Sequence, residues 1–79
     1  MVGYETWELL YLNGYAISDS DTAVDPMYFG YINNAGEWYI MKQGIAGGTF
    51  RYAKGSSDYT TNWTGRAGLT YQYFNQTFK

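Results

Sequence analysis

Residues 27–55, "MYFGYINNAGEWYIMKQGIAGGTFRYAKG", contain three runs of aromatic and β-branched side chains separated by two turn signals. Such runs are typical of β-strands, in which successive side chains alternate between the two faces of a sheet. The segment Asn33–Gly36 predicts a hairpin loop, with Gly36 at a position that needs a positive φ angle. The glycines of "QGIAGG" (43–48) predict a second turn. The stretch therefore predicts an antiparallel meander.

Apolar side chains occur on both faces of this meander. Trp38 and Ile40 point one way along their strand, whereas Tyr39 and Met41 point the other way. One face is expected to pack on the core, so the second face needs another cover. A surface rich in Tyr, Met and Arg but poor in Lys is typical of protein interfaces. We therefore expect the second face to contact other protein subunits, and the candidate contact residues are Tyr28, Tyr31, Tyr39, Met41 and Tyr52. The alternative is a small carbohydrate-binding module, whose exposed rings stack on sugars.

The segments on either side of the meander complete the predicted fold. Alternation over Tyr4–Ala16 predicts a strand, and the aperiodic, Asp-rich segment Ser18–Pro26 predicts a surface loop. Ser56, Ser57 and Asp58 predict either a capped helical turn as far as Trp63 or a loop. Alternation over residues 69–78 predicts a closing strand. The prediction is a single all-β domain, residues 1–79, with about five mostly antiparallel strands in a twisted sheet or small sandwich.

Composition limits the partners that this domain can have. The chain has 79 residues, no cysteine, a net charge of −2 and only five basic residues, so neither disulfides nor a nucleic-acid-binding patch is expected. Seventeen aromatic residues exceed the need of so small a core. The start, "MVGYETWELLYL", is interrupted by Glu5 and Glu8 and predicts neither a signal peptide nor a membrane span. We expect no membrane partner.

The residues that usually carry chemistry are scarce. Because the chain lacks His and Cys, Ser and Thr have no customary base and zinc has no customary ligands. Asp19-Ser20-Asp21 opens like a calcium loop, but Val24 stands where that loop needs Gly, and Gly30 where it needs a bidentate Glu. A solvated turn is the expectation there. No pair of carboxylates is singled out for acid–base work, so we expect no enzyme activity, metal or cofactor.

Arg66 lies among aromatic residues in "NWTGRAGLTY" (62–71) and leaves two interpretations open. It is either an ordinary surface arginine or a guanidinium stacked on Trp63 or another ring. In the second case its fork would bind loop carbonyls or Asp58 and attach the last loop to the sheet. Both interpretations are structural.

Three blocks of the chain, "YLNGYA", "EWYIMK" and "NWTGRAGLTY", together resemble a family of small structural proteins of tailed bacteriophages. The family pattern is an aromatic-x-Gly-x-Ala strand, a Trp-x-Ile-x-Lys strand and a terminal Trp-x-x-Arg-x-x-Leu-x-Tyr segment. The matching positions are Tyr11, Gly14, Tyr15, Ala16, Trp38, Ile40, Lys42, Trp63, Arg66, Leu69 and Tyr71. The chain differs from the family in the longer segment "SDTAVDPMYFGYINNAG" (20–36).

The resemblance implies a virion component without enzyme activity: a head decoration or a tail or neck protein. It implies a location in the virion after synthesis in the host bacterial cytoplasm, with several symmetric copies contacting other virion subunits. The residues of these blocks expected to act structurally are Trp38, Ile40, Trp63, Arg66, Leu69 and Tyr71.

Overall fold

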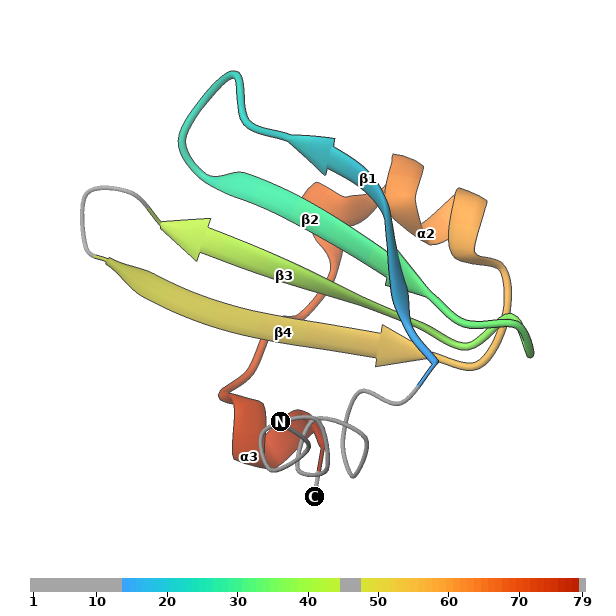
Figure 1. Ribbon diagram of the computed structural model, residues 1–79. Helices are drawn as coiled ribbons and strands as arrows, with labels where there is room; N and C mark the ends of the chain where they lie inside the picture. The colour runs from blue at the N-terminus through green and yellow to red at the C-terminus, as the bar shows by residue number, and fades with distance from the viewer. Residues whose placement is uncertain (1–13, 45–47, 79) are drawn as a thin grey trace, which may run out of the picture.

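Four strands follow one another in a single antiparallel sheet, in the order β1-β2-β3-β4, within the residues that the computed structural model describes, 14–44 and 48–78 (Figure 1). The strands are β1 (Ala16–Asp21), β2 (Met27–Ile32), β3 (Trp38–Gly44) and β4 (Thr49–Gly55). They are followed by α2 (Tyr59–Thr64), the 3-10 turn η1 (Arg66–Gly68) and α3 (Phe74–Thr77). The mostly β, antiparallel class predicted from the sequence is confirmed, and the described residues contain four of the strands.

The predicted meander is confirmed in the pairing of β2, β3 and β4, whereas the middle of the second predicted turn, residues 45–47, lies outside the described residues. Asn33 accepts hydrogen bonds on its side-chain oxygen from the backbone N–H groups of Ala35 and Glu37, both at 3.0 Å. Gly36 has the expected positive φ, +87°, which a residue without Cβ adopts at little cost. The pairing of β3 with β4 runs without a break from Trp38 opposite Gly55 to Gly44 opposite Thr49.

The prediction of a surface loop over Ser18–Pro26 is wrong in its first half, because β1 extends to Asp21. β1 pairs with β2, with an irregularity between Ile17 and Asp19. Aspartate is usually depleted in strands. Here the tyrosine hydroxyl of α2 and the guanidinium of η1 donate to Asp19 and Asp21, at 2.8 and 2.7 Å. These long-range partners offset the poor strand propensity and are invisible in the local sequence.

The core lies on the face of the sheet that carries Trp38 and Ile40, here called the first face. In Figure 1, α2 covers this face from behind. Its buried members are Tyr28, Trp38, Ile40 and Tyr59, and Ile32, Trp63, Leu69 and Tyr71 pack around them. Of the two predictions for residues 56–63, the helical turn is the one observed. The expected side-chain cap is not: Asp58 has φ +59° and makes no capping hydrogen bond with its carboxylate.

The prediction of a closing strand over residues 69–78, here called the C-terminal strap, is also wrong. Only Gln72 pairs with the sheet, through two backbone hydrogen bonds of 2.8 Å with Tyr52 at the outer edge of β4. Tyr71 packs on the first face, whereas Phe74 and Phe78 lie against Tyr52 on the opposite face. The strap therefore passes around the edge of the sheet. The strand predicted over Tyr4–Ala16 lies mostly outside the described residues.

Candidate functional site

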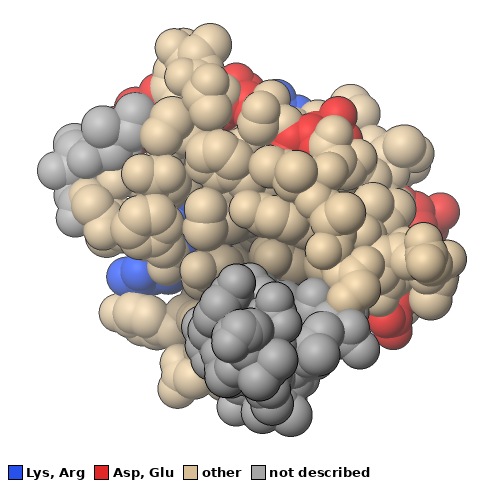
Figure 2. Space-filling model, viewed as in Figure 1, with Lys and Arg blue, Asp and Glu red and all other residues tan. Residues whose placement is uncertain are grey.

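The second face of the sheet is an aromatic surface. It consists of Ile17, Phe29, Tyr31, Tyr39, Met41, Phe50 and Tyr52, which the strand register places on the side away from α2. In the view of Figure 2, uncharged residues fill the part of the middle that is not grey, and most of the coloured Asp, Glu, Lys and Arg atoms lie toward the outline. A surface with an apolar centre and a charged rim is the usual composition of a protein contact.

Tyr39 is the centre of the aromatic cluster on this face. Its ring stacks on Tyr31 with centroids 4.5 Å apart and planes 13° apart, and Tyr15 meets it edge-on at 5.1 Å. Phe78 of the C-terminal strap lies edge-on at 5.2 Å. Only 5% of Tyr39 is exposed. It is therefore a core residue of the second face, and the prediction that it contacts a partner is corrected on that ground.

Part of the second face is covered by the chain itself. The rings of Phe74 and Phe78 lie 5.3 and 5.8 Å from Tyr52. Phe50 and Ile17, at two ends of the face, remain 44% and 58% exposed. Near Tyr52 the second face is therefore covered by the C-terminal strap of the same chain, whereas Phe50 and Ile17 remain exposed.

The predicted contact residues do not all share one face. Tyr31, Tyr39, Met41 and Tyr52 lie together on the second face. Tyr28 does not: it stands opposite Lys42, packs into the first-face core and is 9% exposed. Its separation of three residues from Tyr31 places it on the other side of a regular strand. Its assignment as a contact residue is therefore wrong.

The residues expected to act structurally meet on the first face: Trp38, Ile40, Trp63, Leu69 and Tyr71 in the core cluster, with Arg66 against it. The Arg66 guanidinium lies 4.4 Å from the Trp63 ring centroid and donates to the Trp63 carbonyl oxygen at 2.8 Å. This confirms the stacked interpretation. The carboxylate partner is Asp21, at 2.7 Å, instead of Asp58.

Two hydroxyl groups in the first-face core have altered acidity. Burial, and next its hydrogen bond to Asp19, raises the pKa of Tyr59 to about 12. Burial is also the main cause that raises the pKa of Tyr71, whose hydroxyl donates to the Arg66 carbonyl oxygen at 2.8 Å. Both groups hold their protons at neutral pH and act as structural donors, which suits attachment of α2 and η1 to the sheet.

The C-terminal strap is also attached through cations. Lys42 lies 4.8 Å from the Tyr71 ring centroid, and Arg51 lies 4.1 Å from that of Tyr73. Lys54 lies 5.7 Å from Phe78. Such contacts contribute about 0.5–1 kcal/mol each at exposed sites. Sequence reasoning missed this role of the basic residues. The available signal was that Phe74 and Phe78, four residues apart as on one face of a helix, leave the odd-numbered alternation of Leu69, Tyr71 and Tyr73.

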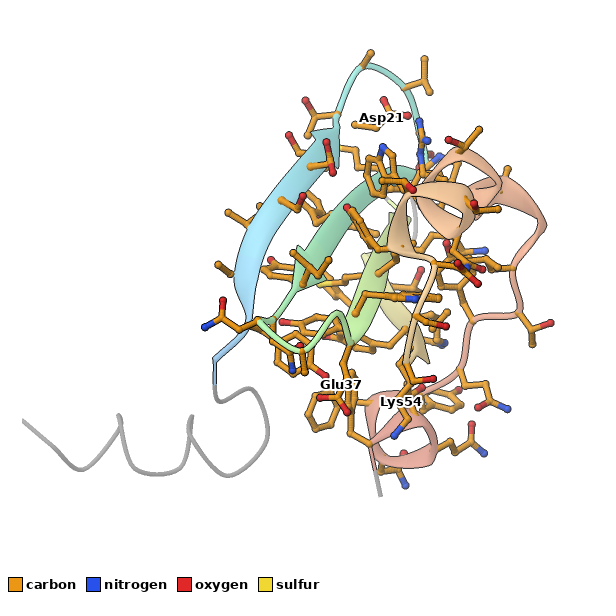
Figure 3. All side chains as sticks on the ribbon, turned by 90° about the vertical axis from the view of Figure 1, so that its right-hand side faces the viewer. Asp21, Glu37 and Lys54 are labelled. Atoms are coloured by element: carbon orange, nitrogen blue, oxygen red, sulfur yellow. The ribbon has the colours of Figure 1, made fainter. Side chains whose placement is uncertain are left out.

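A cleft of about 390 Å³ opens where the strap leaves the β4 edge. Its lining consists of Trp38, Tyr52, Ala53, Lys54, Asn62, Leu69, Thr70, Gln72, Gln76 and Thr77. Figure 3 labels Lys54 and Glu37 at the end of the sheet near α3, with Asp21 at the far end beside α2. No sequence pattern predicts this cleft, because its lining comes from separate segments that the path of the strap brings together.

Two kinds of feature are absent from residues 14–44 and 48–78. No group of three or more His, Cys, Asp or Glu side chains is placed to hold a metal ion. No helix in these ranges has the length and apolarity needed to cross a membrane. In comparisons with protein-family models, curated proteins and solved structures, the chain matches none.

Proposed function

We propose that the protein is a non-enzymatic structural subunit of a tailed-phage particle, a head decoration or a tail or neck component, that acts through contacts of its second face with other virion subunits. The observation that carries the proposal is the exposed remainder of an aromatic face. Phe50 and Ile17 stay accessible although the strap has covered the neighbouring Tyr52.

The geometry of the second face supports a protein partner. Tyr31 and Met41 are half-buried, so each has both a packed side and an accessible side. The register places them on a diagonal of the second face, between Ile17 on β1 and Phe50 on β4. A partner that covered this diagonal would bury rings already held in place by their neighbours, so little side-chain entropy would be lost on binding.

The sequence blocks that resemble phage structural proteins support the choice of particle. Their residues Trp38, Ile40, Trp63 and Leu69 build the first-face core, which is a role in holding the domain together. Repeated copies on a symmetric particle make a modest contact per copy sufficient, because many contacts act together. No catalytic role is needed for any of these residues.

The test is quantitative mass spectrometry of gradient-purified particles from the source culture, following the tryptic peptide of residues 55–66, "GSSDYTTNWTGR". We expect the peptide to sediment with the major capsid protein at a fixed ratio that survives high-salt washing. A peptide that stays in the soluble fraction, or that washes off the particle progressively with salt, would contradict the proposal.

A further inference from the structure

The cleft beside β4 exists because the strap pairs with the sheet at one residue only. Gln72 forms an isolated antiparallel bridge with Tyr52, so Thr70 would stand opposite Lys54 if the pairing continued. It does not continue, and both Thr70 and Lys54 instead line the cleft. In an antiparallel strand, backbone groups two residues apart point to the same side. The N–H and C=O of Lys54 therefore point toward the cleft, as those of Tyr52 point toward Gln72.

The side chains around this opening are neutral and polar. Asn62 comes from α2, Gln72 from the strap and Gln76 from α3, and Thr70 adds a hydroxyl group. The Thr77 hydroxyl is already bonded to the Tyr52 and Tyr73 carbonyl oxygens, and the Asn62 amide donates one bond to the Asp58 carbonyl oxygen. None of the lining residues carries a carboxylate. An amide side chain both donates and accepts hydrogen bonds, so it can pair with a ligand group, such as a hydroxyl, that also donates and accepts.

The floor of the cleft is apolar and fixed. Trp38 is buried, and its ring nitrogen donates to the Ser57 carbonyl oxygen at 2.6 Å, which holds the ring in place. Ala53 and Leu69 add aliphatic surface beside it. The ammonium group of the cleft's one cation, Lys54, lies over the Phe78 ring, so no strong charge dominates the site.

We infer that this cleft binds a neutral saccharide of one or two rings. A sugar has hydroxyl groups that donate and accept together and a C–H face that packs on apolar surface, and the cleft offers both complements. Its volume of about 390 Å³ is within the range of small-ligand sites. The site is distinct from the exposed rings of the second face and does not depend on the proposed subunit contacts.

The test is a titration of the ¹⁵N-labelled full chain with chitobiose, maltose and cellobiose at millimolar concentration, followed by amide NMR. We expect at least one disaccharide to shift the side-chain amide signals of Asn62, Gln72 and Gln76 in a saturable manner. In Gln72→Ala/Gln76→Ala the dissociation constant should rise at least about fivefold, the effect of losing one hydrogen bond. Asn75→Ala, next to Gln76 on α3 but outside the cleft lining, is the matched control and should bind like the original chain.

Three results would overturn the inference: no saturable shift with any of the three sugars, shifts confined to second-face residues such as Tyr31, or equal binding by the double variant and the Asn75→Ala control. Both glutamines have exposed side chains, and the resolved backbone amide signals of each variant report that it is folded. If the double variant fails to fold, each single glutamine variant takes its place in the same comparison.

Discussion

Arg66 joins three separate parts of the first face. Its guanidinium contacts the Trp63 ring, the Trp63 carbonyl and the Asp21 carboxylate, and it lies 5.5 Å from the Tyr28 ring centroid. The side chains of Arg66 and Asp21 are 24% and 28% exposed. A charge-assisted hydrogen bond in such a half-buried place is held by its neighbours more firmly than a pair on the open surface.

This contact predicts an acid-sensitive contribution to stability. The hydrogen bond from Arg66 is the main cause that lowers the pKa of Asp21 below its ordinary 3.8. Because the pKa of Asp21 is lower in the folded state, the contact contributes stability above pH 3.8. This contribution is lost as the pH falls through the folded-state pKa. We expect the urea midpoint of Asp21→Asn to fall less steeply between neutral pH and pH 2 to 3 than that of the original chain. Parallel curves for the two proteins over that range would show that the contact carries no such linkage.

At the scale of elements, the sequence predicted what local chemistry determines. The β2–β3 hairpin follows from Asn33 and Gly36, and the β3–β4 pairing follows from alternation and glycine content. β1 was missed because its aspartates depend on Tyr59 and Arg66, which are 40 and 45 residues away. The strap was predicted as a strand because its tyrosines alternate. Its path instead follows from the packing of Phe74 and Phe78 on the second face.

Gly30 on β2 sets how closely α2 approaches the sheet. A Cβ at this position would collide with the Tyr59 hydroxyl and lie 2.9 Å from a ring carbon of Trp63. We expect Gly30→Ala to lower the free energy of unfolding by about 1–3 kcal/mol through overpacking. Gly68→Ala is the control, since nothing lies within 4 Å of its Cβ. Equal urea midpoints for the two variants would mean that α2 is not held against β2 in solution.

The C-terminal strap predicts a second effect at this scale. Phe78 contacts Tyr39 and Tyr52 from across the β4 edge. Phe78→Ala should lower the free energy of unfolding by about 2 kcal/mol, less than for a fully buried ring, and should uncover part of the second face. The measurement is urea unfolding together with binding of a hydrophobic dye, with the exposed Asn75→Ala as control. An unchanged midpoint and unchanged dye binding would place the strap off the sheet.

At the scale of the whole molecule, the two faces of the sheet differ in how they are covered. The first face is closed by α2, η1 and the start of the strap, and its rings hold the domain together. Within residues 14–44 and 48–78, the strap closes the second face near Tyr39 and Tyr52. The sequence predicted that both faces are apolar, but it could not show which rings the chain covers itself, because that depends on where the strap crosses.

The proposed subunit contact therefore predicts an effect at the exposed residues instead of at Tyr39. Phages carrying Ile17→Ser or Phe50→Ser should incorporate roughly tenfold less of the protein per particle, because burying one such side chain contributes about 1.5–3 kcal/mol. The control is Val24→Ser, an exposed apolar residue in the β1–β2 connection, 64% accessible. Quantitative mass spectrometry of purified particles measures the occupancy. Equal occupancy in all three variants would remove these residues from the contact.

The pairing of Gln72 with Tyr52 also limits how copies of this domain can join. A sheet whose two outer strands both offer free backbone groups can recruit copies at either side and grow into an open-ended fibril. Among the described residues, the strap occupies the middle of the β4 side, which leaves β1 as the outer strand for backbone-mediated growth. A domain that can pair through only one edge strand forms a dimer and no larger oligomer. At high local protein concentration, the strap would therefore oppose backbone-mediated polymerisation of this aromatic, strand-rich domain.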